Sequence, residues 1–114
     1  MSLYFRIDEK DDYAIVNFNF DIVFDNINIF EDFIEMIKKN SKDAFIFNME
    51  HVKSIDSLGL GKLLKLYQHM NVTNKKVVIA NINNNIRYLF HITQLEMIFK
   101  VADSIEEAIR LLRE

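Results

Sequence analysis

The stretch Ser54-Ile55-Asp56-Ser57-Leu58-Gly59-Leu60-Gly61 decides how the rest of the chain is arranged. It holds both glycines of a 114-residue chain that contains no proline. Glycine inside a helix costs roughly 1 kcal/mol relative to alanine, so two glycines at the start of a helix indicate a specific local requirement. An apolar segment at residues 44–49 precedes the stretch, and apolar residues at helical spacing follow it. The sequence therefore predicts a strand, a tight junction and then a helix from about residue 57 to residue 70.

The junction is a candidate interaction site. Asp56 and Ser57 lie at the predicted start of the helix, where unpaired backbone N–H groups and the positive end of the dipole attract anions. Both side chains also suit a helix cap, and we favour capping over phosphate acceptance for Ser57. Gly59 and Gly61 leave the first turn bare, so we expect another molecule's backbone to approach there, although close packing on the sheet explains the same glycines. A structure that buries the Gly59 backbone under another element would contradict docking at this point.

Strand and helix patterns alternate along the chain. Strands are predicted at residues 3–7, 13–20, 44–49, 76–80 and 97–101. Helices are predicted from residue 29, from residue 57, around residues 86–90 and after a capping box that begins at Ser104. The order β-β-α-β-α-β-α-β-α predicts a single α/β domain over residues 1–114, with a mixed, mostly parallel sheet and helices packed on it. Binding sites in such sheets collect at the carboxyl ends of the strands, where residues 50–58 fall.

Composition and charge exclude several classes of protein. Half of the residues are hydrophobic, which excludes a disordered chain. No apolar run has the length of a membrane span, and the N-terminus lacks the pattern of a signal peptide. The chain has no cysteine, a net charge of −3 and scattered Lys and Arg residues. We therefore expect a cytoplasmic protein that does not bind nucleic acid and does not insert into a membrane.

The three histidines do not form a recognisable catalytic or metal site. The spacing of His51, His69 and His91 matches no ligand motif. His51 together with Ser57 and Asp56 lacks the glycine-flanked elbow of a hydrolase. We expect no catalytic residue, no cofactor and no metal.

Residues 46–61 resemble the signature of the STAS domains, the anti-sigma factor antagonists and their relatives. Segments at residues 77–81, 87–90 and 93–95 follow the later pattern of the same family. The resemblance implies a small mixed sheet and a function based on docking onto another protein, such as an anti-sigma factor that is also a serine kinase. Asp21 loosely matches the acid before the family's first helix, but the usual preceding glycine is missing. The residues that the resemblance places at the partner are Asp21, Asp56, Ser57, Leu58, Gly59, Leu60 and Gly61.

Leu58 departs from the family pattern at the position that matters for regulation. The family's usual run is Asp-Ser-Ser/Thr-Gly, and its second hydroxyl accepts a phosphate that ends docking. Leu58 occupies that position, so the resemblance implies that the usual phosphorylation switch is absent, with Ser57 as a weaker candidate acceptor. Leu58 either contacts a partner or folds into the core, and we expect it to be exposed and to contact a partner.

Two further alternatives stay open at this point. STAS domains also serve membrane transport, so a second function is that of an accessory subunit beside an ABC-type ATPase. The run that contains Phe18, Phe20, Ile22, Val23 and Phe24 is more apolar than a strand and a loop require. Part of this run is predicted to face a partner or a second copy of the chain in a homodimer. The helical stripe of Leu60, Leu63, Leu64 and Tyr67 is predicted to enter the core.

Overall fold

A computed structural model describes residues 4–114 of the chain. The strands are β1 (Phe5–Glu9), β2 (Ala14–Phe18), β3 (Ala44–Asn48), β4 (Lys76–Ala80) and β5 (Val101–Ala102). The α-helices are α1 (Ile27–Lys38), α2 (Ser57–Val72), α3 (Asn84–Ile92) and α4 (Ile105–Leu112). Two short 3-10 helices, η1 (Phe24–Asn26) and η2 (Leu95–Met97), lie between them. The predicted alternation of strands and helices is confirmed, and no helix within residues 4–114 is both long and apolar enough to cross a membrane.

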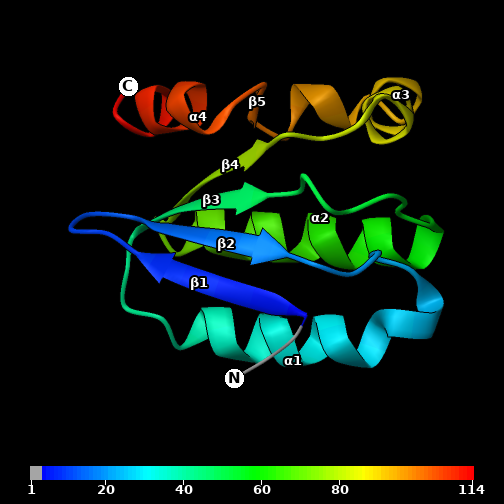
Figure 1. Cartoon of the computed structure of the whole chain (residues 1–114), viewed down its shortest axis with the longest axis horizontal. Coiled ribbons are helices and arrows are strands. Elements are labelled where there is room, and N and C mark those ends of the chain that lie inside the picture. The colour runs from blue at the N-terminus through cyan, green and yellow to red at the C-terminus, as the bar shows by residue number, and fades with distance from the viewer. Residues whose placement is uncertain (1–3) are drawn as a thin grey trace.

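The strands form one sheet in the order β1-β2-β3-β4-β5. β1 pairs antiparallel with β2, and every other neighbouring pair is parallel. The predicted mixed, mostly parallel sheet is therefore confirmed. In Figure 1 the arrows of β2 and β3 point toward the side where η1, the start of α2 and α3 lie. This side holds the carboxyl ends of the parallel strands.

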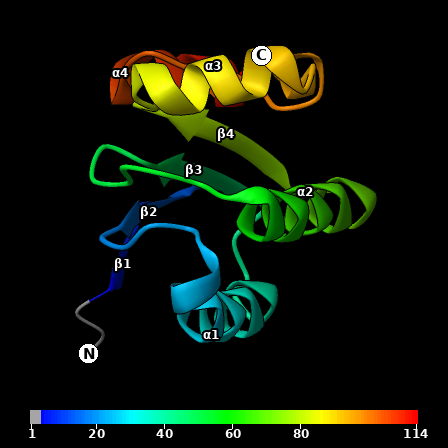
Figure 2. The ribbon, with the colours of Figure 1, turned by 90° about the vertical axis from the view of Figure 1, so that its right-hand side faces the viewer.

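Helices cover both faces of the sheet. α1 and α2 lie together along one face, as the view in Figure 2 shows. The core on this side is rich in phenylalanine, and its rings meet edge to face, as Phe18 and Phe33 do with centroids 4.8 Å apart. α4 packs on the other face against Ile46 of β3 and Val78 of β4. The strong amphipathic patterns of α1, α3 and α4 fit this arrangement, because one stripe of each helix is buried and the other is solvated.

The last strand differs from the prediction. Residues 97–101 read as an apolar strand, but the chain turns at Gln94, which has a φ of 61°, and then forms η2. Met97 is 83% exposed, whereas Phe99 is buried between the rings of Tyr67 and Phe90. Pairing with β4 begins only at Val101. Phe99 is therefore apolar because its ring packs in the core rather than because it pairs in a strand, and Met97 and Ile98 are exposed.

Three smaller predictions also need correction. The first predicted strand began at Leu3, which lies outside the described residues, and β1 continues to Glu9 rather than ending at Ile7. Phe18, Phe20 and Ile22 are buried in the core, so only the end of their apolar run is available to a partner. Ser104 caps α4 as predicted, since its Oγ accepts from the Glu107 N–H at 3.0 Å. The second bond of the capping box is different from the prediction. The Glu107 carboxylate accepts from the Asp103 N–H at 2.8 Å instead of from the Ser104 N–H.

Candidate functional site

Two loops meet at the carboxyl end of the sheet and position the start of α2. The segment after β2 and the segment before α2 form a parallel bridge between Ile22 and Ile55. The Ile22 N–H donates to the Ser54 carbonyl at 3.2 Å, and the Asp56 N–H donates to the Ile22 carbonyl at 3.3 Å. Both isoleucines are buried, so the bridge anchors the two loops in the core.

Asp21 and Asp56 connect the same two loops through hydrogen bonds, each from its own loop to the backbone of the other. The Asp21 carboxylate accepts from the Lys53 N–H at 2.7 Å and lies 3.3 Å from the Ser54 hydroxyl. The Asp56 carboxylate accepts from the Phe24 N–H at 2.8 Å, so each loop supplies an acid to the backbone of the other. These bonds give both acids a structural role, and contact with a partner remains a prediction for each.

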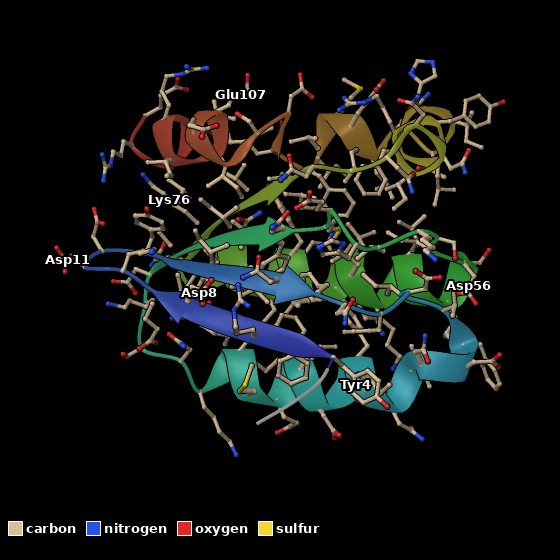
Figure 3. All side chains as sticks on the ribbon, in the orientation of Figure 1. Tyr4, Asp8, Asp11, Asp56, Lys76 and Glu107 are labelled. Carbon is tan, nitrogen blue, oxygen red and sulfur yellow. The ribbon has the colours of Figure 1, made fainter. Side chains whose placement is uncertain are left out.

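Asp56 is also the N-cap of α2. Its other carboxylate oxygen accepts from the Gly59 N–H at 2.8 Å. The bonds from the N–H groups of Gly59 and Phe24 lower the pKa of Asp56 below its ordinary value, because they stabilise the charged form. Figure 3 labels Asp56 at the end of the molecule where η1 and α2 meet. Of the two residues predicted to cap the helix, Asp56 is therefore confirmed, whereas the prediction that Ser57 provides the cap is wrong.

The two glycines have different environments, and the expectation for Gly59 is wrong. A Cβ placed on Gly59 would lie 1.8 Å from the carbonyl oxygen of Ile22. The backbone that approaches this turn is thus the chain's own, and Gly59 is buried. Docking onto the Gly59 backbone is therefore contradicted, and a partner can reach this helix start only at its exposed side chains. Gly61 has no heavy atom within 4 Å of such a Cβ and is exposed, so it does not pack on the sheet.

Ser57 and Leu58 point out of the molecule at the start of α2. Ser57 is the first residue of the helix and is exposed, and its hydroxyl makes no hydrogen bond within residues 4–114. Leu58 is 41% exposed, which confirms that it does not fold into the core. Leu60 is half-buried against the core, whereas Leu63 and Tyr67 are fully within it. A phosphate or a partner could reach the outer pair without any rearrangement of the helix.

A groove beside this helix start was not predicted from the sequence. It has a volume of about 310 Å³ and lies between the segment before α2 and the exposed side of α3. Two of its lining residues are large and exposed, Tyr88 at 65% and Ile92 at 57%. Phe24 of η1, 66% exposed, adds a third such side chain near the bridge. The signal in the sequence is that Tyr88 and Ile92 fall outside the apolar stripe of α3, which Ile86 and Phe90 form.

We use the name docking surface for this set of groups. It comprises the exposed apolar side chains Phe24, Leu58, Tyr88 and Ile92, the Ser57 hydroxyl, and the groove-lining residues Ser54, Ile55, Asn85 and Leu89.

The histidines do not contribute to this surface. His91 pairs with Glu96 at 2.8 Å, on the exposed side of α3. His51 lies in the exposed turn after β3, and His69 lies near the end of α2. Among residues 4–114, no three His, Asp or Glu side chains come close enough to share a metal ion.

Comparison with known proteins gives consistent matches across the chain. The model of the STAS domain family matches residues 4–108. A Thermotoga maritima protein, provisionally named an anti-sigma factor antagonist, is 25% identical over 105 residues, which cover 90% of this chain and 92% of that protein.

Solved structures show the same fold. A crystal structure of a provisionally named Thermotoga maritima anti-sigma factor antagonist superposes with a TM-score of 0.84 at 23% identity, covering 96% of this chain and 95% of that one. An anti-sigma factor antagonist from Mycobacterium paratuberculosis gives 0.86 at 18% identity, covering 99% and 96%. The Bacillus cell fate determinant SpoIIAA in its phosphorylated form gives 0.66 at 18% identity, covering 93% and 96%. At these identities the superpositions establish the fold.

Proposed function

The chain belongs to the STAS domain family, and from this premise we propose that it is a non-catalytic protein-interaction module of the anti-sigma factor antagonist type. We place it in the cytoplasm, with an anti-sigma factor that is also a serine kinase as its partner. The observation that carries the proposal is the docking surface at the start of α2. The similarity to an anti-sigma factor antagonist over most of both chains supports it.

The exposed apolar side chains favour a protein partner. Phe24, Tyr88 and Ile92 are each more than half exposed, and Leu58 lies on the same end of the molecule. Large apolar groups that are exposed on a surface mark sites where another protein can exclude water. Aromatic residues at the centre of such sites often dominate the binding energy. The shallow groove beside them suits side chains of a partner better than it suits an enclosed small molecule.

Leu58 supports a docking surface that is not regulated by phosphorylation at the family's usual position. A phosphoserine carries about −1.5 to −2 charges at neutral pH and opposes burial against an apolar partner. Leucine has no hydroxyl to modify, and covering the 41% of Leu58 that is exposed contributes about 0.6–1.2 kcal/mol in an interface. SpoIIAA, which shares this fold, has been solved in a phosphorylated form, and this supports phosphate as a switch in proteins of this fold. We propose that this chain stays competent for docking when its kinase is active.

The alternative is regulation by phosphorylation of the free hydroxyl of Ser57. It lies next to Leu58, is exposed and forms no internal bond in the described residues. A switch moved by one residue would place the phosphate there instead. Intact-mass measurement after incubation with ATP and the cognate kinase distinguishes an unmodified wild-type chain from one phosphorylated on Ser57. Leu58→Ser is the positive control for phosphate transfer. We expect one phosphate on Leu58→Ser and none on the wild type, and efficient modification of wild-type Ser57 with loss of binding would overturn the constitutive account.

The partner class is tested by direct binding. We expect the purified chain to bind an anti-sigma factor kinase from the same genome in a calorimetric titration. The transport function makes a different prediction, which is stable co-purification with an ABC-type ATPase and no binding to the kinase. That second result would replace the antagonist function with the accessory-subunit function.

A further inference from the structure

β1 leaves one side of its backbone unpaired at the end of the sheet. It is the first strand in the sheet order and pairs only with β2. Among residues 4–114, Figures 1 and 2 show no other strand beside it in the plane of the sheet. An open edge of this kind is a template for pairing with another strand.

The hydrogen bonds at the two ends of the hairpin fix which backbone groups face outward. The Asn19 N–H donates to the Tyr4 carbonyl at 2.7 Å, and the Lys10 N–H donates to the Tyr13 carbonyl at 2.8 Å. Bonding residues alternate along an antiparallel pair, so the even-numbered residues of β1 bond to β2. The N–H and C=O groups of Phe5, Ile7 and Glu9 therefore point away from β2. We call these outward groups the β1 edge.

The charged side chains on this strand have opposite signs two residues apart. Arg6 Nε lies 3.0 Å from one oxygen of Asp8, and an Arg6 terminal nitrogen lies 3.1 Å from the other. The side chains remain 71% and 37% exposed, respectively. This arrangement lowers the pKa of Asp8, first through the hydrogen bond with Arg6. The guanidinium still has further N–H donors for a second carboxylate.

We propose that a second copy of this chain pairs with the β1 edge, antiparallel and about a two-fold axis at Ile7. In this register Ile7 lies opposite its own copy, and Arg6 of each copy lies opposite Asp8 of the other. Phe5 lies opposite Glu9, so all three outward-facing residues of each copy enter hydrogen-bonded pairs. The four charges then form a reciprocal network on one face of the extended sheet.

Other registers are less favourable. A two-fold axis at Arg6 places two guanidinium groups directly opposite each other, and an axis at Asp8 does the same for two carboxylates. Like charges opposite each other destabilise a strand pair, whereas opposite charges stabilise it. The order Arg6, Ile7, Asp8 is thus complementary to itself only when the axis passes through Ile7. A single added strand pair belongs to the small class of interfaces, under about 1,200 Å², so the dimer is weak and depends on concentration.

Charge reversal tests the register. Sedimentation analysis of the full chain over a series of concentrations should show a monomer–dimer equilibrium. Arg6→Asp and Asp8→Arg, made singly, should each weaken the dimer about tenfold, because like charges then face each other. The double variant R6D/D8R restores opposite pairs and should return the dissociation constant to near the wild-type value. Thermal unfolding of each variant checks that the monomer fold is intact.

Amide exchange measured by NMR locates the contact. The amides of Phe5 and Ile7 should become protected as concentration rises, while those near Leu58 should not change. A chain that stays monomeric at every soluble concentration overturns the proposal. So does a dimer that is insensitive to both single variants, or one that protects the docking surface instead. A chain that stays monomeric, or a dimer that is insensitive to both variants, leaves kinase binding unaffected, and kinase binding is measured separately, so the two proposals can fail independently.

Discussion

Gly59 and Gly61 show how much one residue's surroundings determine its role. Both lie in the first two turns of α2, and both precede a leucine or a lysine on an otherwise ordinary helix. Only Gly59 lies against another part of the chain, the carbonyl of Ile22. Because Gly59 has no side chain, the bridge between the two loops can approach the helix this closely.

Alanine substitutions at the two glycines should have opposite effects. Gly59→Ala forces a methyl group into the Ile22 backbone, so we expect a loss of at least about 1–3 kcal/mol in the free energy of unfolding. Gly61→Ala meets open space within a helix and should stabilise the chain by about 0.5–1 kcal/mol. Urea unfolding of both variants measures the difference. Equal effects of the two substitutions would show that the Ile22 contact does not constrain the helix.

Asp56 predicts how stability responds to acid. Its pKa is lower in the folded chain than in the unfolded chain, through the N–H groups of Gly59 and Phe24. Its contribution is therefore present above the unfolded-state pKa and is lost as the pH falls through the folded-state pKa. Asp56→Asn should be less stable than the wild type near neutral pH and should lose less stability on acidification.

Thermal unfolding at several pH values tests this prediction. Asp32→Asn, on the exposed side of α1, serves as the control for removal of a carboxylate. If Asp56→Asn and the wild type lose stability in parallel as the pH falls, the cap does not carry the charge dependence assigned to it.

At the scale of elements, α2 links the docking surface to the far side of the core. Its start is held by the loops that Asp21 and Asp56 fasten. Near its other end, the Tyr67 hydroxyl accepts from the Lys100 N–H at 2.9 Å and donates to the Val77 carbonyl at 3.4 Å. A single side chain thus joins α2 to β4 and to the segment that leads into β5.

Tyr67→Phe should loosen that segment while keeping the ring in place. The variant leaves a backbone N–H and a carbonyl without their partner, which costs about 1–3 kcal/mol when they are buried. We expect faster exchange of the Lys100 amide and a lower midpoint of urea unfolding. Tyr88→Phe, at an exposed tyrosine, is the matched control and should leave both measurements unchanged. An unchanged Lys100 amide in Tyr67→Phe would argue against this connection.

At the scale of the whole molecule, most of the fold could be predicted because strand and helix periods alternate clearly. β4 was predicted at its observed bounds, and the helix after Asp56 was placed to within two residues of its end. β5 was misplaced because Phe99 is apolar for its contacts with two rings rather than for strand pairing. A local pattern does not reveal such long-range packing.

The candidate site was only partly predictable for the same reason. The sequence identified Asp56, Ser57 and Leu58, which lie together on one short segment. It did not identify the carbonyl of Ile22 beneath Gly59, or Tyr88 and Ile92 beside the groove. Those groups reach the helix start through the sheet topology, which brings residues about thirty positions apart into contact.

The measurement that tests the docking account most directly is the affinity of three proteins for the purified anti-sigma factor kinase. Leu58→Asp places a charge at the start of α2, and Val72→Asp places the same charge at an 81% exposed residue at the other end of that helix. Calorimetric titration should show wild-type affinity for Val72→Asp and an affinity weaker by at least about tenfold for Leu58→Asp, because burying an unpaired carboxylate against the partner costs more than the roughly 1.4 kcal/mol that gives this factor. Equal binding by Leu58→Asp and the wild type would contradict the account, because the partner would then not contact the start of α2.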